Sequence, residues 1–185
     1  MEDMTGWFAG LVDGEGCFML HVTKRGNRSV GVQPVFAINM NDGGWVQPVS
    51  DILTTNGIPF SKRRIHETMV YIQVSGISNV KKVCKLVAPF TVIKKPLVER
   101  LTNYIGRSVS DRLNEIDILR IADDVDFVRA FNRKKNIPYK WDGDKICEVY
   151  GITRNKSVPH GTKTNQCGDA REVDGTALRT QRLVH

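Results

Sequence analysis

The sequence contains no run of about 20 apolar residues, which is the length that a membrane-spanning helix needs. It begins with Met1, Glu2 and Asp3, so it also lacks the basic start of a secretory signal. These two absences predict a protein of the cytoplasm or of an organelle interior that is neither secreted nor embedded in a membrane.

Closely spaced cysteines and an acidic excess are also missing. The cysteines are scattered without any C-x-x-C pair, so a structural zinc site is not expected, and we interpret them as thiols. The 27 Lys and Arg residues outnumber the 20 Asp and Glu residues, which gives a net charge of +7. This charge mildly favours a polyanionic partner.

Two pairs of alternating segments predict β-hairpins. Residues 17–25 and 30–40 alternate between apolar and polar side chains on either side of a basic turn, and residues 60–66 and 69–74 repeat the pattern. Helical periodicity is found at 45–57, 75–87, 97–105 and from Ser108 or Ser110 to Phe131, with a small packed segment at 141–150. This order predicts an α+β fold with a four-stranded antiparallel sheet and helices on one of its faces.

The periodic pattern ends near Gly151. We therefore expect one domain at residues 1–150, followed by a tail at residues 151–185 that is disordered or packed at the periphery.

The face of the sheet away from the helices is expected to be polar, basic and rich in amides. Lys and Arg side chains neutralise phosphates, and Arg, Gln and Asn side chains read base edges. For any single residue, an ordinary surface position is an equally good interpretation. The residues proposed to contact DNA are His21, Thr23, Arg25, Arg28, Gln33, Asn39, Lys62, Arg64, Tyr71 and Gln73.

Residues 8–16 read F-A-G-L-V-D-G-E-G. The small residues Ala9 and Gly10 predict a helix that another backbone approaches closely, and Gly14 and Gly16 are expected to end it. Glu15 then lies at the negative end of the helix dipole, where a metal ion or another positive charge would stabilise it. A short core helix with a glycine cap and two solvated acids is the alternative interpretation.

This stretch resembles the signature of the LAGLIDADG homing endonucleases, with Phe8, Val12, Gly14 and Glu15 in place of Leu, Ile, Ala and Asp. The resemblance extends to about Phe131 and implies the family fold, αββαββα with a saddle-shaped sheet on DNA. The sequence contains one such motif, which in this family implies a homodimer. The implied dimer interface comprises Phe8, Ala9, Gly10, Val12 and Asp13.

The resemblance also implies the chemistry of the site. Glu15, helped by the Gly14 carbonyl, would bind Mg²⁺ or Mn²⁺ for phosphodiester hydrolysis. Lys94 would stabilise charge or order water near the scissile phosphate, although a solvated lysine is the alternative. Relatives often carry Gln where this chain has Met40, and Asn39 or Asn41 could take that role. Asp13 is expected to be structural.

We therefore expect an intron-encoded, site-specific endonuclease that makes staggered double-strand breaks at a long, near-palindromic DNA site. The alternatives are a maturase that binds intron RNA without cleavage, a DNA-binding regulator on the same fold, and a scaffold protein with an incidental basic face. The intact acid Glu15 favours the endonuclease.

Overall fold

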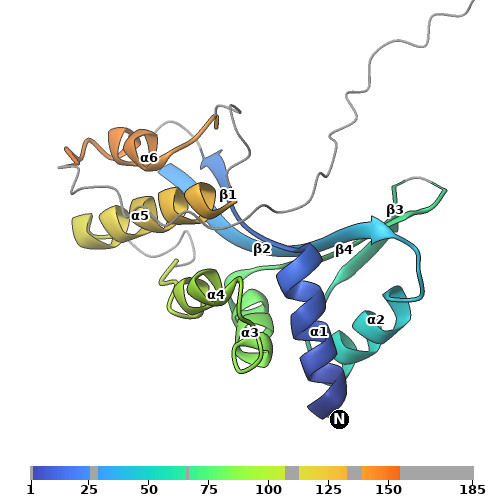
Figure 1. Cartoon of the computed structure of the whole chain (residues 1–185). Coiled ribbons are helices and arrows are strands. Elements are labelled where there is room, and N and C mark those ends of the chain that lie inside the picture. The colour runs from blue at the N-terminus through green and yellow to red at the C-terminus, as the bar shows by residue number, and fades with distance from the viewer. Residues whose placement is uncertain (1, 26–28, 66, 107–112, 133–138, 155–185) are drawn as a thin grey trace, which may run out of the picture.

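A computed structural model describes residues 2–25, 29–65, 67–106, 113–132 and 139–154. The elements follow the expected α+β order (Figure 1). They are α1 (Glu2–Glu15), β1 (Gly16–Arg25), β2 (Ser29–Asn41), α2 (Val46–Thr55), β3 (Ser61–Arg64), β4 (Met69–Ser75), α3 (Ile77–Val87), α4 (Lys95–Thr102), α5 (Glu115–Phe131) and α6 (Gly143–Val149). Among the described residues, no helix combines the length and hydrophobicity needed to cross a lipid bilayer.

The four strands form one antiparallel sheet in the order β1-β2-β4-β3. β1 pairs with β2 along its whole length, whereas β4 pairs with β2 only from Val35 to Asn41. The next residue of β2 is Pro34, which has no N–H to continue the ladder with β4. Residues 20–25 and 29–34 therefore continue past the four-stranded part as a two-stranded extension, which we call the outer ribbon.

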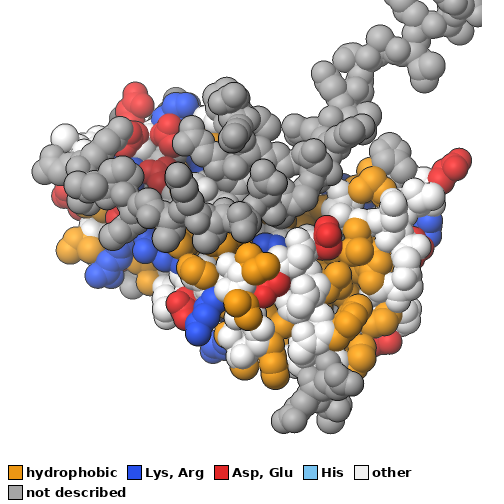
Figure 2. All heavy atoms as spheres, viewed as in Figure 1, with side chains coloured by type: hydrophobic (Ala, Val, Ile, Leu, Met, Phe, Trp, Pro, Cys, Tyr) orange, Lys and Arg blue, Asp and Glu red, His pale blue; other side chains and the backbone are white. Residues whose placement is uncertain are grey.

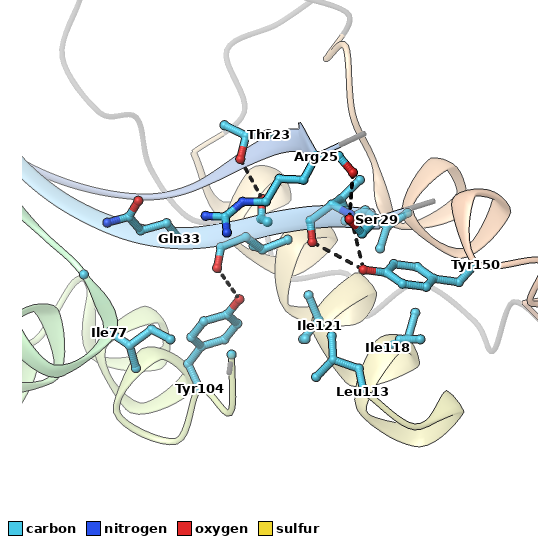
Figure 3. A pocket seen from close by; sticks show the side chains of 16 residues that line it. Thr23, Arg25, Ser29, Gln33, Ile77, Tyr104, Leu113, Ile118, Ile121 and Tyr150 are labelled. Carbon is cyan, nitrogen blue, oxygen red and sulfur yellow. Dashed lines mark hydrogen bonds between the residues drawn. The ribbon is translucent and has the colours of Figure 1, made fainter. Parts of the chain in front are cut away.

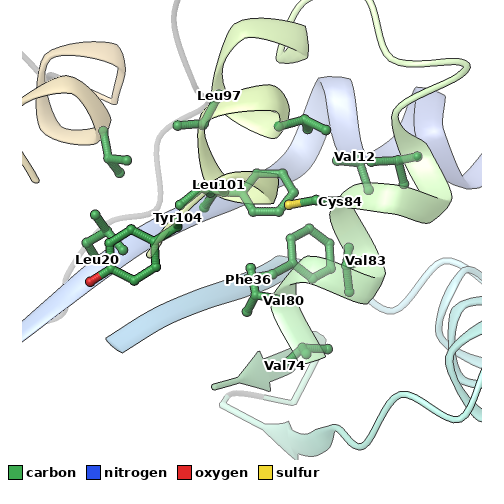
Figure 4. Close-up of a cluster of buried hydrophobic side chains, with 14 of the residues drawn as sticks. Val12, Leu20, Phe36, Val74, Val80, Val83, Cys84, Leu97, Leu101 and Tyr104 are labelled. Carbon is green, nitrogen blue, oxygen red and sulfur yellow. The ribbon is translucent and has the colours of Figure 1, made fainter. Parts of the chain in front are cut away.

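The hydrophobic core lies between one face of the sheet and the helices α1, α3 and α4 (Figure 4). β4 shows the expected alternation, because Val70, Ile72 and Val74 are buried and the residues between them are half-buried. The ring of Phe36 lies 4.9 Å from that of Phe18 and 6.2 Å from that of Phe8, so it joins β2 to both β1 and α1. This packing fixes α1 against the sheet that it precedes.

α1 begins at Glu2, earlier than the signature alone indicated, and passes directly into β1. Neither Gly14 nor Gly16 has a positive φ, so the turn does not depend on a left-handed residue. A Cβ on Gly16 would lie 2.7 Å from the Val12 carbonyl oxygen and 2.9 Å from the Val12 Cα. Gly16 is therefore needed because the strand starts against the backbone of the last helical turn.

The C-terminal helices differ in detail from the expectation. α5 begins at Glu115, where the side chain of Asn114 accepts a hydrogen bond from the Asp117 amide at 2.8 Å. The expected starts at Ser108 and Ser110 lie outside the described residues. The packed chain continues past 150, because the Ile152 amide donates to the Cys147 carbonyl at 3.0 Å. The remainder of the expected tail, residues 155–185, also lies outside the described part.

Gly16→Ala should destabilise the protein by about 1–3 kcal/mol, because the new methyl group overlaps backbone atoms that cannot move independently. Urea unfolding followed by circular dichroism measures this loss. Gly43→Ala is the matched control, since a Cβ there meets its nearest atom at 3.9 Å. Equal stabilities of the two variants would contradict the close approach at Gly16.

Candidate functional site at the end of helix α1

The end of α1 presents two oxygen donors to solvent. Glu15 is the last residue of the helix, and both it and Gly14 are exposed. A carboxylate at a helix C-terminus meets the negative end of the dipole. A positive charge nearby would therefore stabilise it.

Lys94 supplies that charge from the chain before α4. Its side chain is only 3% exposed, and Nζ donates to the carbonyl oxygens of Val12 at 2.7 Å and Asp13 at 2.8 Å. The ammonium group thus caps the C-terminal carbonyls of the helix that carries Glu15. Lys94 is not the solvated lysine of the alternative interpretation, and its role in catalysis stays a prediction.

Asp13 of α1 in turn accepts hydrogen bonds from the chain before α4. Its carboxylate accepts hydrogen bonds from the Thr91 hydroxyl and from the amides of Val92 at 2.7 Å, Ile93 at 3.2 Å and Lys94 at 2.9 Å. Burial raises the pKa of Asp13, but these hydrogen bonds outweigh it and hold the pKa below its ordinary value. We call this two-way contact between Asp13 and residues 91–94 the α1–α4 clamp.

The donor chemistry at the end of α1 fits a hard divalent cation, because carboxylate and carbonyl oxygens are the ligands that Mg²⁺ prefers. One chain supplies few of them. Among the described residues, no group of three or more His, Cys, Asp and Glu side chains is placed to hold a metal ion.

The strand register places most of the predicted DNA contacts on one face of the sheet. His21 lies opposite Gln33, and Asn39 lies opposite Tyr71. A Cβ on Gly31 would lie 2.7 Å from Arg25 Nε, so Gly31 leaves room for the Arg25 side chain to lie across the ribbon. The residues that share this polar face are His21, Thr23, Arg25, Gln33, Asn39, Tyr71 and Gln73.

The expected positions of Lys62 and Arg64 are wrong. Lys62 lies opposite Ile72 and Arg64 opposite Val70, so both side chains are on the other face of the sheet. Arg64 forms an ion pair with Asp42 at 2.8 Å. Arg28 lies outside the described residues.

Arg63 occupies the polar face that was assigned to its neighbours. It lies opposite Tyr71, and its guanidinium carbon is 4.6 Å from the centre of the Tyr71 ring. The sequence did not reveal this residue, because a one-residue change in the register of a short strand exchanges its two faces. Only the observed pairing of β3 with β4 identifies it.

Asn39 is better placed than Asn41 to take the place of the polar residue that relatives often carry where this chain has Met40. Met40 lies opposite Val70 and packs against the core. Asn41 accepts a hydrogen bond from the Thr68 hydroxyl at 3.4 Å. Asn39 Oδ1 is buried, and no donor among the described residues reaches it. An unpaired buried oxygen is costly, so a water molecule or a ligand donor would be held there.

The outward face of α1 differs from the expected interface. Phe8, Ala9 and Val12 are 0% exposed in the chain's own core, so they have no surface to offer a second chain. Asp13 belongs to the α1–α4 clamp, and only Gly10 of the five predicted residues is exposed.

An apolar patch lies beside this outward face. Figure 2 shows hydrophobic side chains gathered along the side of the molecule where α1 and α2 lie. Phe90 approaches α1 at Gly6, where an added Cβ would be 4.0 Å from its ring. Five exposed apolar residues lie on α1 or on the segment that contacts it, and we call them the α1 patch: Met4, Trp7, Phe90, Val92 and Ile93.

Comparisons with known proteins agree with this architecture. The sequence profile described as LAGLIDADG endonuclease matches residues 8–105. No protein of curated function matches the sequence significantly.

Solved structures of homing endonucleases share the fold. I-CvuI, in complex with the I-CreI target in the presence of Mg, is 16% identical with a TM-score of 0.62, covering 83% of this chain and 98% of that one. The archaeal intron-encoded I-Vdi141I, complexed with DNA, is 17% identical with a TM-score of 0.60, covering 82% and 97%. The meganuclease I-AabMI, bound to uncleaved DNA, is 16% identical with a TM-score of 0.51, covering 82% of this chain but 50% of that one.

The lowered pKa of Asp13 predicts a loss of stability in acid. Because the folded pKa lies below the unfolded one, the unfolded state binds the proton first as the pH falls. The stabilisation is complete above the ordinary Asp value of about 4 and disappears as the pH falls through the folded pKa. Urea unfolding at a series of pH values between about 7 and 2 measures the effect.

Asp13→Asn should remove this component and destabilise the protein by about 2–3 kcal/mol at neutral pH, because an amide nitrogen would face backbone donors. Asp51→Asn on the exposed side of α2 is the control. If both variants kept the acid-dependent loss of the wild type, the clamp would not be its origin.

Proposed function

The chain belongs to the LAGLIDADG endonuclease family, and from this premise we propose that two copies together cut both strands of a specific, nearly palindromic DNA site in a metal-dependent reaction. The observation that carries the proposal is the exposed Glu15 at the end of α1, just beyond the carbonyls of Val12 and Asp13 that Lys94 caps. An acid exposed in this way is available to a cation, which in turn can bind a phosphate. The sheet that starts at the next residue supplies the surface for the DNA.

Glu15 and the Gly14 carbonyl would hold Mg²⁺ or Mn²⁺. A bound divalent metal stabilises the attacking and leaving oxygens of phosphodiester hydrolysis. Lys94 contributes by binding the carbonyls of Val12 and Asp13, which places a positive charge at the end of the helix that carries Glu15. Asn39, with its unpaired oxygen, is the residue we propose for ordering a water molecule.

A second copy completes the site. An isologous contact through the α1 patch would bring two α1 helices together, and their two Glu15 side chains would lie on either side of the symmetry axis. Gly10 is exposed, and beyond its own helical turn no atom of the described residues lies within 4 Å of where its Cβ would be, which leaves room for another backbone. This chain spans nearly all of I-CvuI but half of I-AabMI, as expected if the unit works in pairs, from two chains or within a longer one.

The polar face of the sheet would bind the DNA. Arg25 and Arg63 are cations suited to phosphates and base edges, and Gln33 and Gln73 are amides suited to base edges. Burial raises the pKa of Tyr71, although Arg63 opposes this shift, and the phenol remains a neutral platform beneath the guanidinium. We also propose that the gene resides in an intron whose insertion site is the target.

Glu15→Gln should lower cleavage by at least about 100-fold while leaving DNA affinity nearly unchanged, because it removes the metal-binding charge and keeps the side-chain volume. A library of candidate insertion sites is incubated with Mg²⁺ and either protein, and cut ends are sequenced.

Unchanged cleavage by Glu15→Gln would refute the assignment of the acid. Binding to structured RNA or duplex DNA without cleavage by either protein would instead identify a maturase or a regulator.

Arg63→Ala should relax the base preference at one symmetry-related pair of target positions by about 1–3 kcal/mol, since Arg is the commonest reader of guanine. Lys62→Ala is the matched control, because the adjacent side chain lies on the opposite face. It should alter no base preference. Selection from a randomised target library compares the two, and equal profiles would show that the observed register does not determine the DNA face.

A further inference from the structure

The free edge of the outer ribbon is closed by two tyrosine hydroxyl groups. Beyond Val35, β2 has β1 on one side and no strand among the described residues on the other. The Tyr104 hydroxyl donates to the Val32 carbonyl at 3.2 Å, and the Gly76 amide donates to the Pro34 carbonyl at 3.1 Å. The Tyr150 hydroxyl accepts from the Val30 amide at 3.2 Å and donates to the Val30 carbonyl at 3.3 Å (Figure 3).

The contact of Tyr150 with Val30 replaces a missing strand. In an antiparallel ladder, every second pair of opposite residues exchanges two backbone hydrogen bonds, one from the N–H and one to the C=O of each residue. One hydroxyl, which is both donor and acceptor, makes the same two bonds to Val30. Val30 lies at the far end of the ribbon, next to the hairpin turn, where a two-stranded segment is least stable by itself.

Tyr150 is held on a rigid base. It follows α6, whose buried residues Ile146 and Cys147 belong to the same core as α5. Arg154, just beyond it, forms ion pairs with Asp123 and Asp126 of α5. α5 and α6 therefore act as one platform for the ribbon.

Between the ribbon and this platform lies a cavity of about 630 Å³ (Figure 3). Its lining includes Ile77, Ile118, Ile121 and Ile146, together with both tyrosines. Among the described residues, Leu20 and Val30 anchor the ribbon in the core, but this cavity interrupts the packing beneath it. The hydroxyl contacts at the edge of the ribbon therefore help to set its orientation. Loss of one contact would let the ribbon move into open space.

We infer that Tyr150, assisted by Tyr104, is a positioning residue that sets the base preference at the outer positions of each DNA half-site. This inference rests on the proposed function. His21, Thr23, Arg25 and Gln33 lie on the ribbon, whereas Asn39, Tyr71 and Gln73 lie on the four-stranded part. β1 starts beside Glu15, and Arg25 lies about 30 Å further along it, so the ribbon residues meet bases far from the bonds that are cut.

The test compares Tyr150→Phe and Tyr104→Phe with the control Tyr139→Phe, which also removes a hydroxyl but from a ring that lies against Arg129 at 4.9 Å. Hydrogen exchange at the Val30 amide reports directly on its hydrogen bond to the Tyr150 hydroxyl, and Tyr150→Phe should accelerate this exchange about 10-fold. Cleavage of a fully randomised target library should show about 10-fold weaker discrimination at the outer positions, unchanged inner positions and an unchanged rate on the preferred site. Tyr104→Phe should show the same pattern, and Tyr139→Phe should match the wild type.

The outcomes distinguish a failure of this inference from a failure of the proposed function. If the wild type prefers no DNA sequence, the proposed function fails and the inference with it. If the wild type is specific and Tyr150→Phe keeps its outer preferences, or loses activity equally at all positions, only the inference is overturned.

Discussion

The α1–α4 clamp is the contact on which the rest of the site depends. The Asp13 carboxylate accepts hydrogen bonds from residues 91–94, and the Lys94 ammonium group donates hydrogen bonds to the carbonyls of Val12 and Asp13. Burying an ammonium group is costly unless it is fully hydrogen-bonded, so this arrangement has little freedom to change. The same contact fixes three things at once: the direction in which α1 ends, the exposure of Glu15, and the position of Val92 and Ile93 beside the outward face of the helix.

The sheet carries two surfaces that are supported differently. Near Glu15 it is four strands wide and its inner face is packed by α1 and α3, so Asn39 and Tyr71 stand on a rigid base. Further out it narrows to two strands beside a cavity, and the edge contacts at Val30 and Val32 replace packing. A surface that follows a long duplex gains from this difference. In the function that we propose, the rigid part would hold the geometry at the bonds to be cut, and the outer part would contact bases further along the duplex.

Much of the fold could be predicted because it follows from local periodicity. The alternation in β4, the hairpins and the signature at residues 8–16 all describe the chain's own backbone, and the structure confirms them. The predictions that were wrong share one physical origin: each concerned a side chain whose position depends on contact between segments distant in the sequence. The face of Arg63 depends on the register of β3, the burial of Phe8 and Val12 depends on which side of α1 meets the sheet, and the burial of Lys94 depends on α1 ending above it. No spacing within one segment contains that information.

Ala9 and Gly10 show how closely the two sides of α1 are constrained. Both residues are small, yet Ala9 is fully buried in the chain's own core, whereas Gly10 faces open space. A larger residue at Ala9 would strain the fold of each copy. An Ala at Gly10 would favour the isolated helix by about 1 kcal/mol, and no contact among the described residues calls for a glycine there. In the dimer that we propose, a second α1 approaching along this stripe would require a residue without a side chain at this position.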